Sequence, residues 1–212
     1  PNVFLFVPLT LRSSRNHAEM AKLLIEQKAR VDAADYTGGA TALMLAARNG
    51  SLAAVTTLIE AGAKVSASTP QGTTVLMQGV ANGSAPIVGA LLMAGAAPNA
   101  RDRSGASALT VAASTGNSAV VKLLAASEAA LDAADAQPRP VECLQAHTFT
   151  HLPKLPEEGN LRCVQGSTAL LVASAAAHHE VIETLIGLGA DVDAKDAEGM
   201  TALMEAARSP EG

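Results

Sequence analysis

The sequence predicts an all-α fold, a solenoid of stacked helix-turn-helix units joined by short hairpin loops. The main observation is a motif, G-x-T/S-x-L, that occurs five times, at 39–43, 72–76, 105–109, 166–170 and 199–203. Apolar residues at helical spacing follow each occurrence. Hydrophobic residues make up 49% of the 212 residues and aromatic residues only 2%. A core of Ala, Leu and Val between small, closely spaced helices suits this composition.

The motif recurs with a fixed period. Three intervals (39 to 72, 72 to 105 and 166 to 199) are 33 residues, and the interval from 105 to 166 is longer by 28 residues. A fixed period of this size is the signature of a repeat array, in which stacked units bury faces that one unit cannot bury alone. We expect one array with an insertion at 136–164 and six units, at 2–34, 35–68, 69–101, 102–134, 165–195 and 196–212.

The first helix of each unit begins at the motif. A Thr or Ser precedes each short apolar run, where its hydroxyl suits a helix N-cap because it accepts a free backbone N–H. These residues are Thr41, Thr74, Ser107, Thr168 and Thr201. The predicted first helices are 41–48, 74–81, 107–114, 168–176 and 201–208.

A second helix follows in each unit after a tight turn. Gly50, Gly83 and Gly116 fit a left-handed exit from the first helix. The predicted second helices are 52–61, 85–94, 118–127 and 180–188, and Gly62, Gly95 and Gly189 follow three of them. Extended, turn-forming segments such as AKVSAS and ADVDAK then lead to the next unit.

This arrangement strongly resembles the ankyrin repeat, with GMTALMEAAR at 199–208 and LIGLGADVDAKD at 185–196 matching its pattern. The resemblance implies a degenerate first unit, in which 7–11 aligns with 41–45 and 17–35 holds the second helix and hairpin. Some positions depart from the family pattern. Thr-Ala-Leu-Met replaces Thr-Pro-Leu-His at 41–44 and 201–204, and Lys28 and Glu128 replace the Gly that ends the second helix.

The resemblance implies a non-catalytic module that binds a protein partner. In the family, hairpin tips and the exposed face of the first helices line a concave groove. The matching positions here are Tyr36, Thr37, Ala40, Arg48, Asn49, Pro70, Gln71, Thr73, Asn82, Arg101, Arg103, Ser104, Ser114 and Thr115. Tyr36 and the arginines are the strongest candidates by residue type.

Motifs for catalysis or cofactor binding are missing from the sequence, which has no GxSxG, GxxxxGK[ST] or HExxH. We therefore expect no enzyme and no cofactor. Asp191, Asp193 and Asp196 lack EF-hand spacing and are interpreted as turn and capping carboxylates. The adjacent pair His178-His179 is interpreted as a solvated turn, because neighbouring side chains on a helix point in different directions.

The insertion holds both cysteines and two of the five histidines. Cys143, His147, His151 and Cys163 have the chemistry of a tetrahedral zinc site, but their spacing fits no standard finger and four prolines favour an extended loop. Three interpretations stay open: a partner-binding or structural loop without metal, which we favour, a Cys143–Cys163 link, and zinc. In the first, the candidate partner-binding residues are Phe149, Leu152 and Leu155.

Charge and cysteine content narrow the remaining function classes. A net charge of −5 gives no reason to expect nucleic acid, and no apolar run is long enough to predict a membrane span. Two cysteines favour an intracellular, cytoplasmic setting, although an organelle reached by leader removal also fits. Two functional hypotheses remain: a scaffold or accessory subunit in a larger assembly, indicated by the low charge, and a regulatory segment of a larger enzyme or channel, indicated by the non-Met start and half-unit end.

Overall fold

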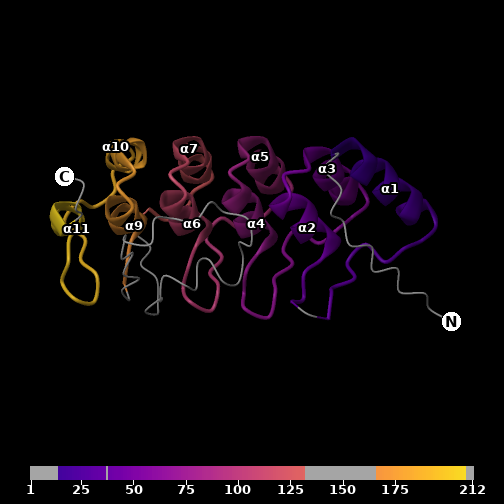
Figure 1. The fold of residues 1–212 in the computed structure, drawn as a ribbon, viewed down its shortest axis with the longest axis horizontal. Helices are drawn as coiled ribbons and strands as arrows, with labels where there is room; N and C mark the ends of the chain where they lie inside the picture. The colour runs from indigo at the N-terminus through magenta and orange to yellow at the C-terminus, as the bar shows by residue number, and fades with distance from the viewer. Residues whose placement is uncertain (1–13, 37, 132–165, 209–212) are drawn as a thin grey trace.

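The structure, a computed structural model, describes residues 14–36, 38–131 and 166–208 (Figure 1). These residues form helices and hairpin loops, and the described part of the chain holds no β-strand beyond isolated bridges. The all-α fold predicted from the sequence is confirmed. The helices are α1 (Ser14–Glu26), α2 (Ala42–Arg48), α3 (Leu52–Glu60), α4 (Val75–Asn82), α5 (Ala85–Met93), α6 (Ala108–Ser114), α7 (Ser118–Ala126), α9 (Ala169–Ala175), α10 (His179–Gly187) and α11 (Ala202–Arg208).

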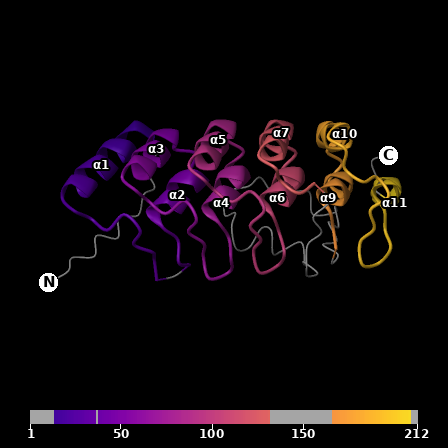
Figure 2. The same ribbon diagram turned by 180° about the vertical axis from the view of Figure 1, so that it is seen from behind.

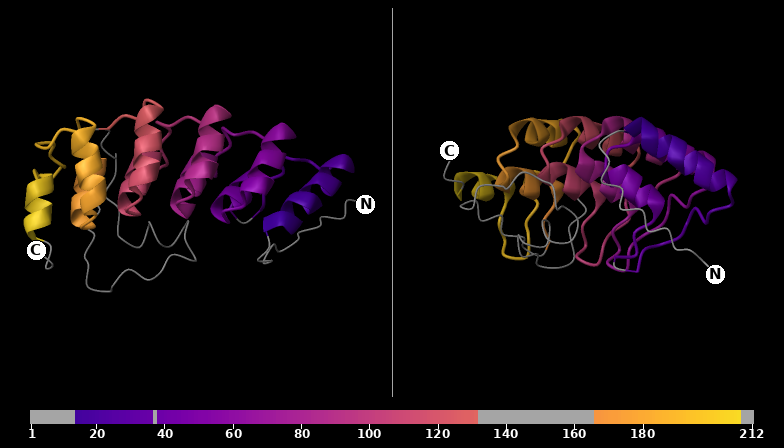
Figure 3. Two further views of the ribbon diagram at one scale, coloured as in Figure 1. Left: turned by 90° about the horizontal axis from the view of Figure 1, so that it is seen from above. Right: turned by 45° about the vertical axis from the view of Figure 1, so that its right-hand side comes forward.

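The helices lie in two rows along the length of the molecule (Figures 1 and 2). The row of first helices contains α2, α4, α6, α9 and α11, and the row of second helices contains α1, α3, α5, α7 and α10. The hairpins extend from the row of first helices, on the side away from the second helices (Figure 1). Each helix pair packs against the next pair, so the units stack in sequence order (Figure 3).

The first helices begin as the sequence predicts. The Oγ1 atom of Thr41 accepts the N–H of Met44 at 3.4 Å, and Thr74 accepts that of Met77 at 3.2 Å. The same bond, from the third residue of the helix, occurs at Ser107, Thr168 and Thr201. All five predicted N-caps are confirmed, and each cap satisfies a backbone N–H that would otherwise lack an intrahelical partner.

A single apolar core runs between the two rows of helices. Leu43, Leu76, Leu109 and Leu170 occupy one position of the repeat, and each is at most 2% exposed. The packing is tight enough to restrict side-chain size. A Cβ atom added to Gly79 would stand 3.1 Å from side-chain atoms of both Ile87 and Leu91, which is closer than ordinary van der Waals contact. This spacing accounts for the shortage of aromatic residues.

The stack continues across residues 132–165, which are outside the described part of the chain. Helix α6 packs against α9 and α7 packs against α10, as α4 packs against α6 and α5 against α7. The long interval between the third and fourth motifs therefore leaves the order of the stack unchanged.

Polar side chains tie each unit to the loop of the unit before it. The Nδ2 atom of Asn82 donates to the carbonyl oxygen of Arg48 at 3.0 Å, and Asn117 donates in the same way to Gly83 at 2.8 Å. Nearer the N-terminus, the backbone N–H of Lys64 donates to the Oδ1 atom of Asp32 in the preceding unit at 2.8 Å. These bonds fix the register between neighbouring units.

The interpretation of His178-His179 as a solvated turn is wrong for His178. Its ring is half-buried, and the Nε2 atom lies 3.1 Å from the carbonyl oxygen of Ser114. His178 thus makes the same kind of link that Asn82 and Asn117 make between other units. The next residue, His179, is exposed and begins α10.

Among the residues that the structure describes, three other than glycine adopt the left-handed backbone conformation. Lys28 and Glu128 each have φ of 62° and stand where other units have Gly. These two positions therefore keep the left-handed conformation although they lack the Gly that favours it. Ala177, with φ of 54°, is the third such residue and ends the turn before α10.

Candidate protein-binding surface

Three of the described hairpins are closed by an aspartate at the turn, and in the hairpin at 67–74 the Oγ1 atom of Thr69 accepts the N–H of Thr73 at 3.2 Å instead. The Oδ1 atom of Asp35 accepts the N–H groups of Gly38 and Ala40 at 2.8 and 3.0 Å. Asp102 and Asp196 repeat the arrangement, each accepting two backbone N–H groups at 2.9 Å. Antiparallel bridges close the stems below, at Ala34–Thr41, Ser68–Thr74 and Arg101–Ser107. The turn backbone is therefore satisfied from within the hairpin, which fixes its shape.

Neighbouring hairpins lie against one another. The N–H of Arg103 donates to the carbonyl oxygen of Gln71 at 2.8 Å, which joins one hairpin to the next. A Cβ atom added to Gly72 would stand 2.9 Å from the Cα of Asp102, and one added to Gly39 would stand 2.6 Å from the Cδ of Pro70. Glycine is required at both contacts, and the hairpins form a row with little room to move independently.

Among the candidate partner-binding residues that the structure describes, most are exposed. Tyr36 is 85% exposed, and Arg48, Asn49, Pro70, Gln71, Asn82, Arg101 and Arg103 are also exposed. Half-buried positions are Ala40, Thr73, Ser104, Ser114 and Thr115. The remaining four, Thr37, Phe149, Leu152 and Leu155, lie outside the described residues.

Several of these candidates also have bonds within the chain. Asn82 bonds to the loop of the preceding unit, as described above. The hydroxyl of Ser104 donates to the carboxylate of Asp102, and that of Ser114 donates to the carbonyl oxygen of Val111 at 2.8 Å. The guanidinium of Arg101 donates to the carbonyl oxygen of Gly105 at 3.2 Å. For these residues a structural role is observed, and partner binding stays a prediction.

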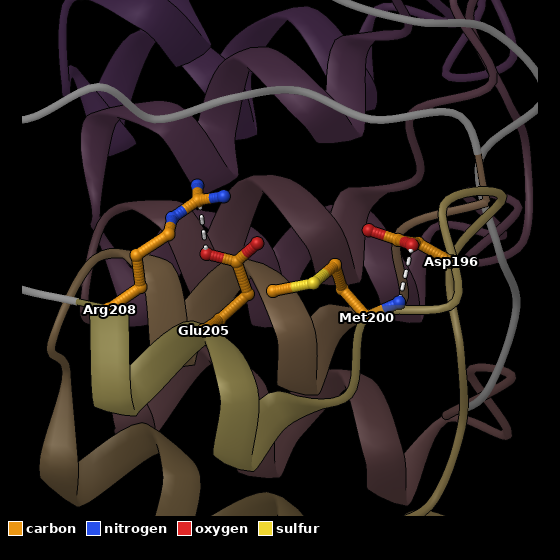
Figure 4. Close-up of polar contacts among 4 residues, drawn as sticks. All are labelled: Asp196, Met200, Glu205 and Arg208. Atoms are coloured by element: carbon orange, nitrogen blue, oxygen red, sulfur yellow. Dashed lines mark hydrogen bonds and ion pairs between the residues drawn. The ribbon is translucent and has the colours of Figure 1, made fainter.

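The last unit brings charged side chains together in a way that its sequence did not indicate (Figure 4). Glu205 on α11 is buried, although its position in the repeat is held by the uncharged residues Leu45, Gln78, Val111 and Val172 in other units. Its carboxylate pairs with the guanidinium of Arg208 at 3.3 Å. Because a buried carboxylate needs a partner, the exposed Arg208 allows Glu205 to occupy a position that is uncharged in the other units.

The acidic residues near the C-terminal hairpin act as the sequence predicts. Asp191 accepts the N–H of Asp193 at 3.0 Å, and Asp196 caps the turn that leads to Met200 (Figure 4). Within the described ranges, His, Cys, Asp and Glu side chains form no group of three or more that could hold a metal ion. Cys143, His147, His151 and Cys163 lie outside these ranges, so all three interpretations of that set remain predictions.

Comparison with known proteins gives one family. The family described as "Ankyrin repeats (3 copies)" matches the chain over residues 7–69, 76–196 and 141–212. A search of curated proteins gave no match to the chain. Across the residues that the structure describes, no helix is both long and apolar enough to cross a membrane.

Proposed function

The chain belongs to the ankyrin repeat family, and from this premise we propose that it binds a protein partner through its hairpin row and the exposed ends of its first helices. Ankyrin repeats are in general protein–protein interaction modules, and ankyrin domains are typically non-catalytic. The proposed role is that of a scaffold or accessory subunit that docks its partner in a larger assembly.

The observation that carries the proposal is the row of hairpins itself. Bonds within each turn and the contact between Arg103 and Gln71 hold the tips in fixed relative positions. A partner that docks on a preformed surface does not have to order it, so less of the interaction free energy is lost on binding. Tyr36, which is 85% exposed, offers an aromatic contact of the kind that is common at binding hot spots.

Site-specific photo-crosslinking tests the proposal. We would place a benzophenone amino acid at Gln71, an exposed position in a hairpin turn, in the full 212-residue chain. The matched control has the same group at Met93, which is 92% exposed and lies on α5 in the row of second helices. We expect a protein adduct in cells from position 71 and none from position 93. An adduct from position 93 alone would show that the partner docks on the other row.

A further inference from the structure

Acidic and basic side chains are used differently on the surface that carries the hairpins. We define the hairpin–helix surface as the hairpins at 33–41, 67–74, 100–107 and 194–201 together with the first helices. Its aspartates Asp35, Asp102 and Asp196 are half-buried or buried, and each accepts two backbone N–H groups. Glu205 is buried and paired with Arg208. Four of the carboxylates on this surface are therefore directed into the protein.

The basic side chains of the same surface are exposed, although Arg101 also donates to the carbonyl oxygen of Gly105. Arg48, Arg101, Arg103, Lys195 and Arg208 are all exposed, Arg208 being paired with Glu205, and Glu198 is the one exposed carboxylate among the described residues of this surface. Arg103 and Arg101 belong to one hairpin, and Arg48 ends α2, two units earlier in the stack. A partner that contacts all three arginines must lie along the stack rather than against a single unit.

On the row of second helices and the loops that follow them, the balance of exposed charges is the opposite of that on the hairpin–helix surface. Their exposed acidic residues outnumber their exposed basic residues within the described part of the chain. The acidic ones are Glu19, Glu26, Asp32, Glu60, Glu128, Glu180, Glu183, Asp191 and Asp193. The basic ones are Lys22, Lys28, Arg30, Lys64 and Lys122. The chain as a whole carries a net charge of −5, yet cations predominate among the exposed charges of its hairpin–helix surface.

We propose that the hairpin–helix surface recognises an acidic segment of the protein partner, with Arg48, Arg101 and Arg103 as its contacts. The proposal rests on the protein-binding function proposed above and names the chemistry of the partner. Arginine suits this role because its planar guanidinium binds a carboxylate through two parallel hydrogen bonds. Charge complementarity of this kind directs association and excludes partners of the wrong sign.

A protein segment fits this surface better than a nucleic acid. Binding to nucleic acid relies on a dense array of cations along the phosphate backbone and on aromatic side chains that stack on bases. Here five exposed cations among the described residues of this surface are spread over several units, the chain has one Tyr and no Trp, and its net charge is negative. Separate carboxylates on an extended peptide match such dispersed cations.

The experiment measures the binding of labelled peptides to the 212-residue chain by fluorescence anisotropy. One probe is a peptide of about 12 residues, which extends to roughly 40 Å, with Glu at alternate positions. The matched probe has Gln in place of every Glu. We expect the Glu peptide to bind at least about tenfold more tightly than the Gln peptide, and to weaken as salt rises from about 20 to about 200 mM.

Two triple variants with the same change in net charge test where on the protein the Glu peptide binds. Arg48→Gln/Arg101→Gln/Arg103→Gln should weaken binding of the Glu peptide about tenfold, because it removes the proposed contacts. Lys22→Gln/Lys64→Gln/Lys122→Gln changes exposed cations outside the surface and should change binding by less than about twofold. Circular dichroism should show that both variants keep the helical content of the wild type.

Several outcomes would overturn the proposal. Equal binding of the Glu and Gln peptides would do so, and equal weakening by the two triple variants would reduce the effect to the charge of the whole chain. A 12-nucleotide single strand that binds more tightly than the Glu peptide would assign the surface to nucleic acid. A protein adduct from position 71 together with no binding of the Glu peptide would leave the docking surface in place and exclude an acidic partner.

Discussion

The Nε2 atom of His178 lies 3.1 Å from the carbonyl oxygen of Ser114, although 64 positions separate the two residues. A carbonyl oxygen can only accept, so Nε2 is the donor. The ring also covers Gly116, where an added Cβ atom would stand 2.8 Å from Nδ1. Nearby, the hydroxyl of Ser118 donates to the carboxylate of Glu180 at 2.6 Å. These contacts join the units on either side of residues 132–165.

The first prediction concerns this joint. Replacing His178 with Ala should lower the free energy of unfolding by about 1 kcal/mol, since a half-buried hydrogen bond to a loop carbonyl is lost. His178→Gln keeps a donor at a similar distance from the backbone and should recover part of the loss. His179→Ala is the control, because that side chain is exposed. Urea denaturation of the three variants measures the effect. Equal stability of His178→Ala and the wild type would show that the bond contributes nothing.

The second prediction concerns a buried polar atom in the core. Gln78 on α4 is 7% exposed, and among the described residues nothing donates a hydrogen bond to its Oε1 atom. The same position holds Leu45 and Val111 in neighbouring units. Gln78→Met keeps the shape of the side chain and removes the polar group, so it should raise the free energy of unfolding by about 1–2 kcal/mol.

Gln27→Met is the matched control for Gln78, because Gln27 is exposed and its change should leave stability within about 0.5 kcal/mol of the wild type. Urea denaturation with an unchanged m-value would show that the native core is retained. A loss of stability in Gln78→Met would contradict the prediction and indicate that the amide has a donor outside the described residues.

The third prediction concerns the left-handed residues that end two second helices. Lys28→Gly and Glu128→Gly should each raise the free energy of unfolding by about 0.5–1 kcal/mol, because a left-handed conformation costs a side-chain-bearing residue more than it costs Gly. The reverse change, Gly62→Ala, should lower stability. Nothing lies within 4 Å of a Cβ atom added to Gly62, so its effect would report backbone conformation alone. A melting temperature of Gly62→Ala above that of the wild type would contradict this account.

The sequence predicts the elements of the fold well because the signals that define them are local. Thr41 and Thr74 cap the helices that follow them within three residues, and the apolar spacing defines the buried face of each helix. Each helix predicted between 41–48 and 201–208 is found within about two residues of its expected ends, and the segment 7–11 of the degenerate first unit lies outside the described residues.

Interactions between units are not evident from the sequence in the same way. Asn82 and Arg48 lie 34 positions apart in the sequence. Whether the side chain of Asn82 reaches the carbonyl of Arg48 therefore depends on the register between their two units. The same holds for His178, whose partner is fixed by stacking across the insertion. Buried Glu205 also conflicts with the uncharged pattern of its position, and its pairing with Arg208 is seen only once the helix is in place.

The last prediction concerns the insertion. Deleting residues 137–164 would place Asp135 three positions before Gly166, the same separation as that between Asp102 and Gly105. The packing of α6 on α9 and of α7 on α10 involves described residues only, and so do the bonds from His178 to Ser114 and from Ser118 to Glu180. The joint should therefore form without the deleted segment.

We expect the deletion variant to keep its helical content. Its free energy of unfolding should lie within about 1 kcal/mol of the wild-type value, since loop-closure entropy changes only slowly with loop length. Urea denaturation followed by circular dichroism measures this, and a variant that fails to fold would show that the segment stabilises the stack. Partner binding should be weakened or altered, because the segment enters at a hairpin position. Zinc bound stoichiometrically by the wild type and not by the variant would favour the site at Cys143, His147, His151 and Cys163. Unchanged stability with unchanged binding and no zinc would mean that the insertion contributes to neither the fold nor partner binding.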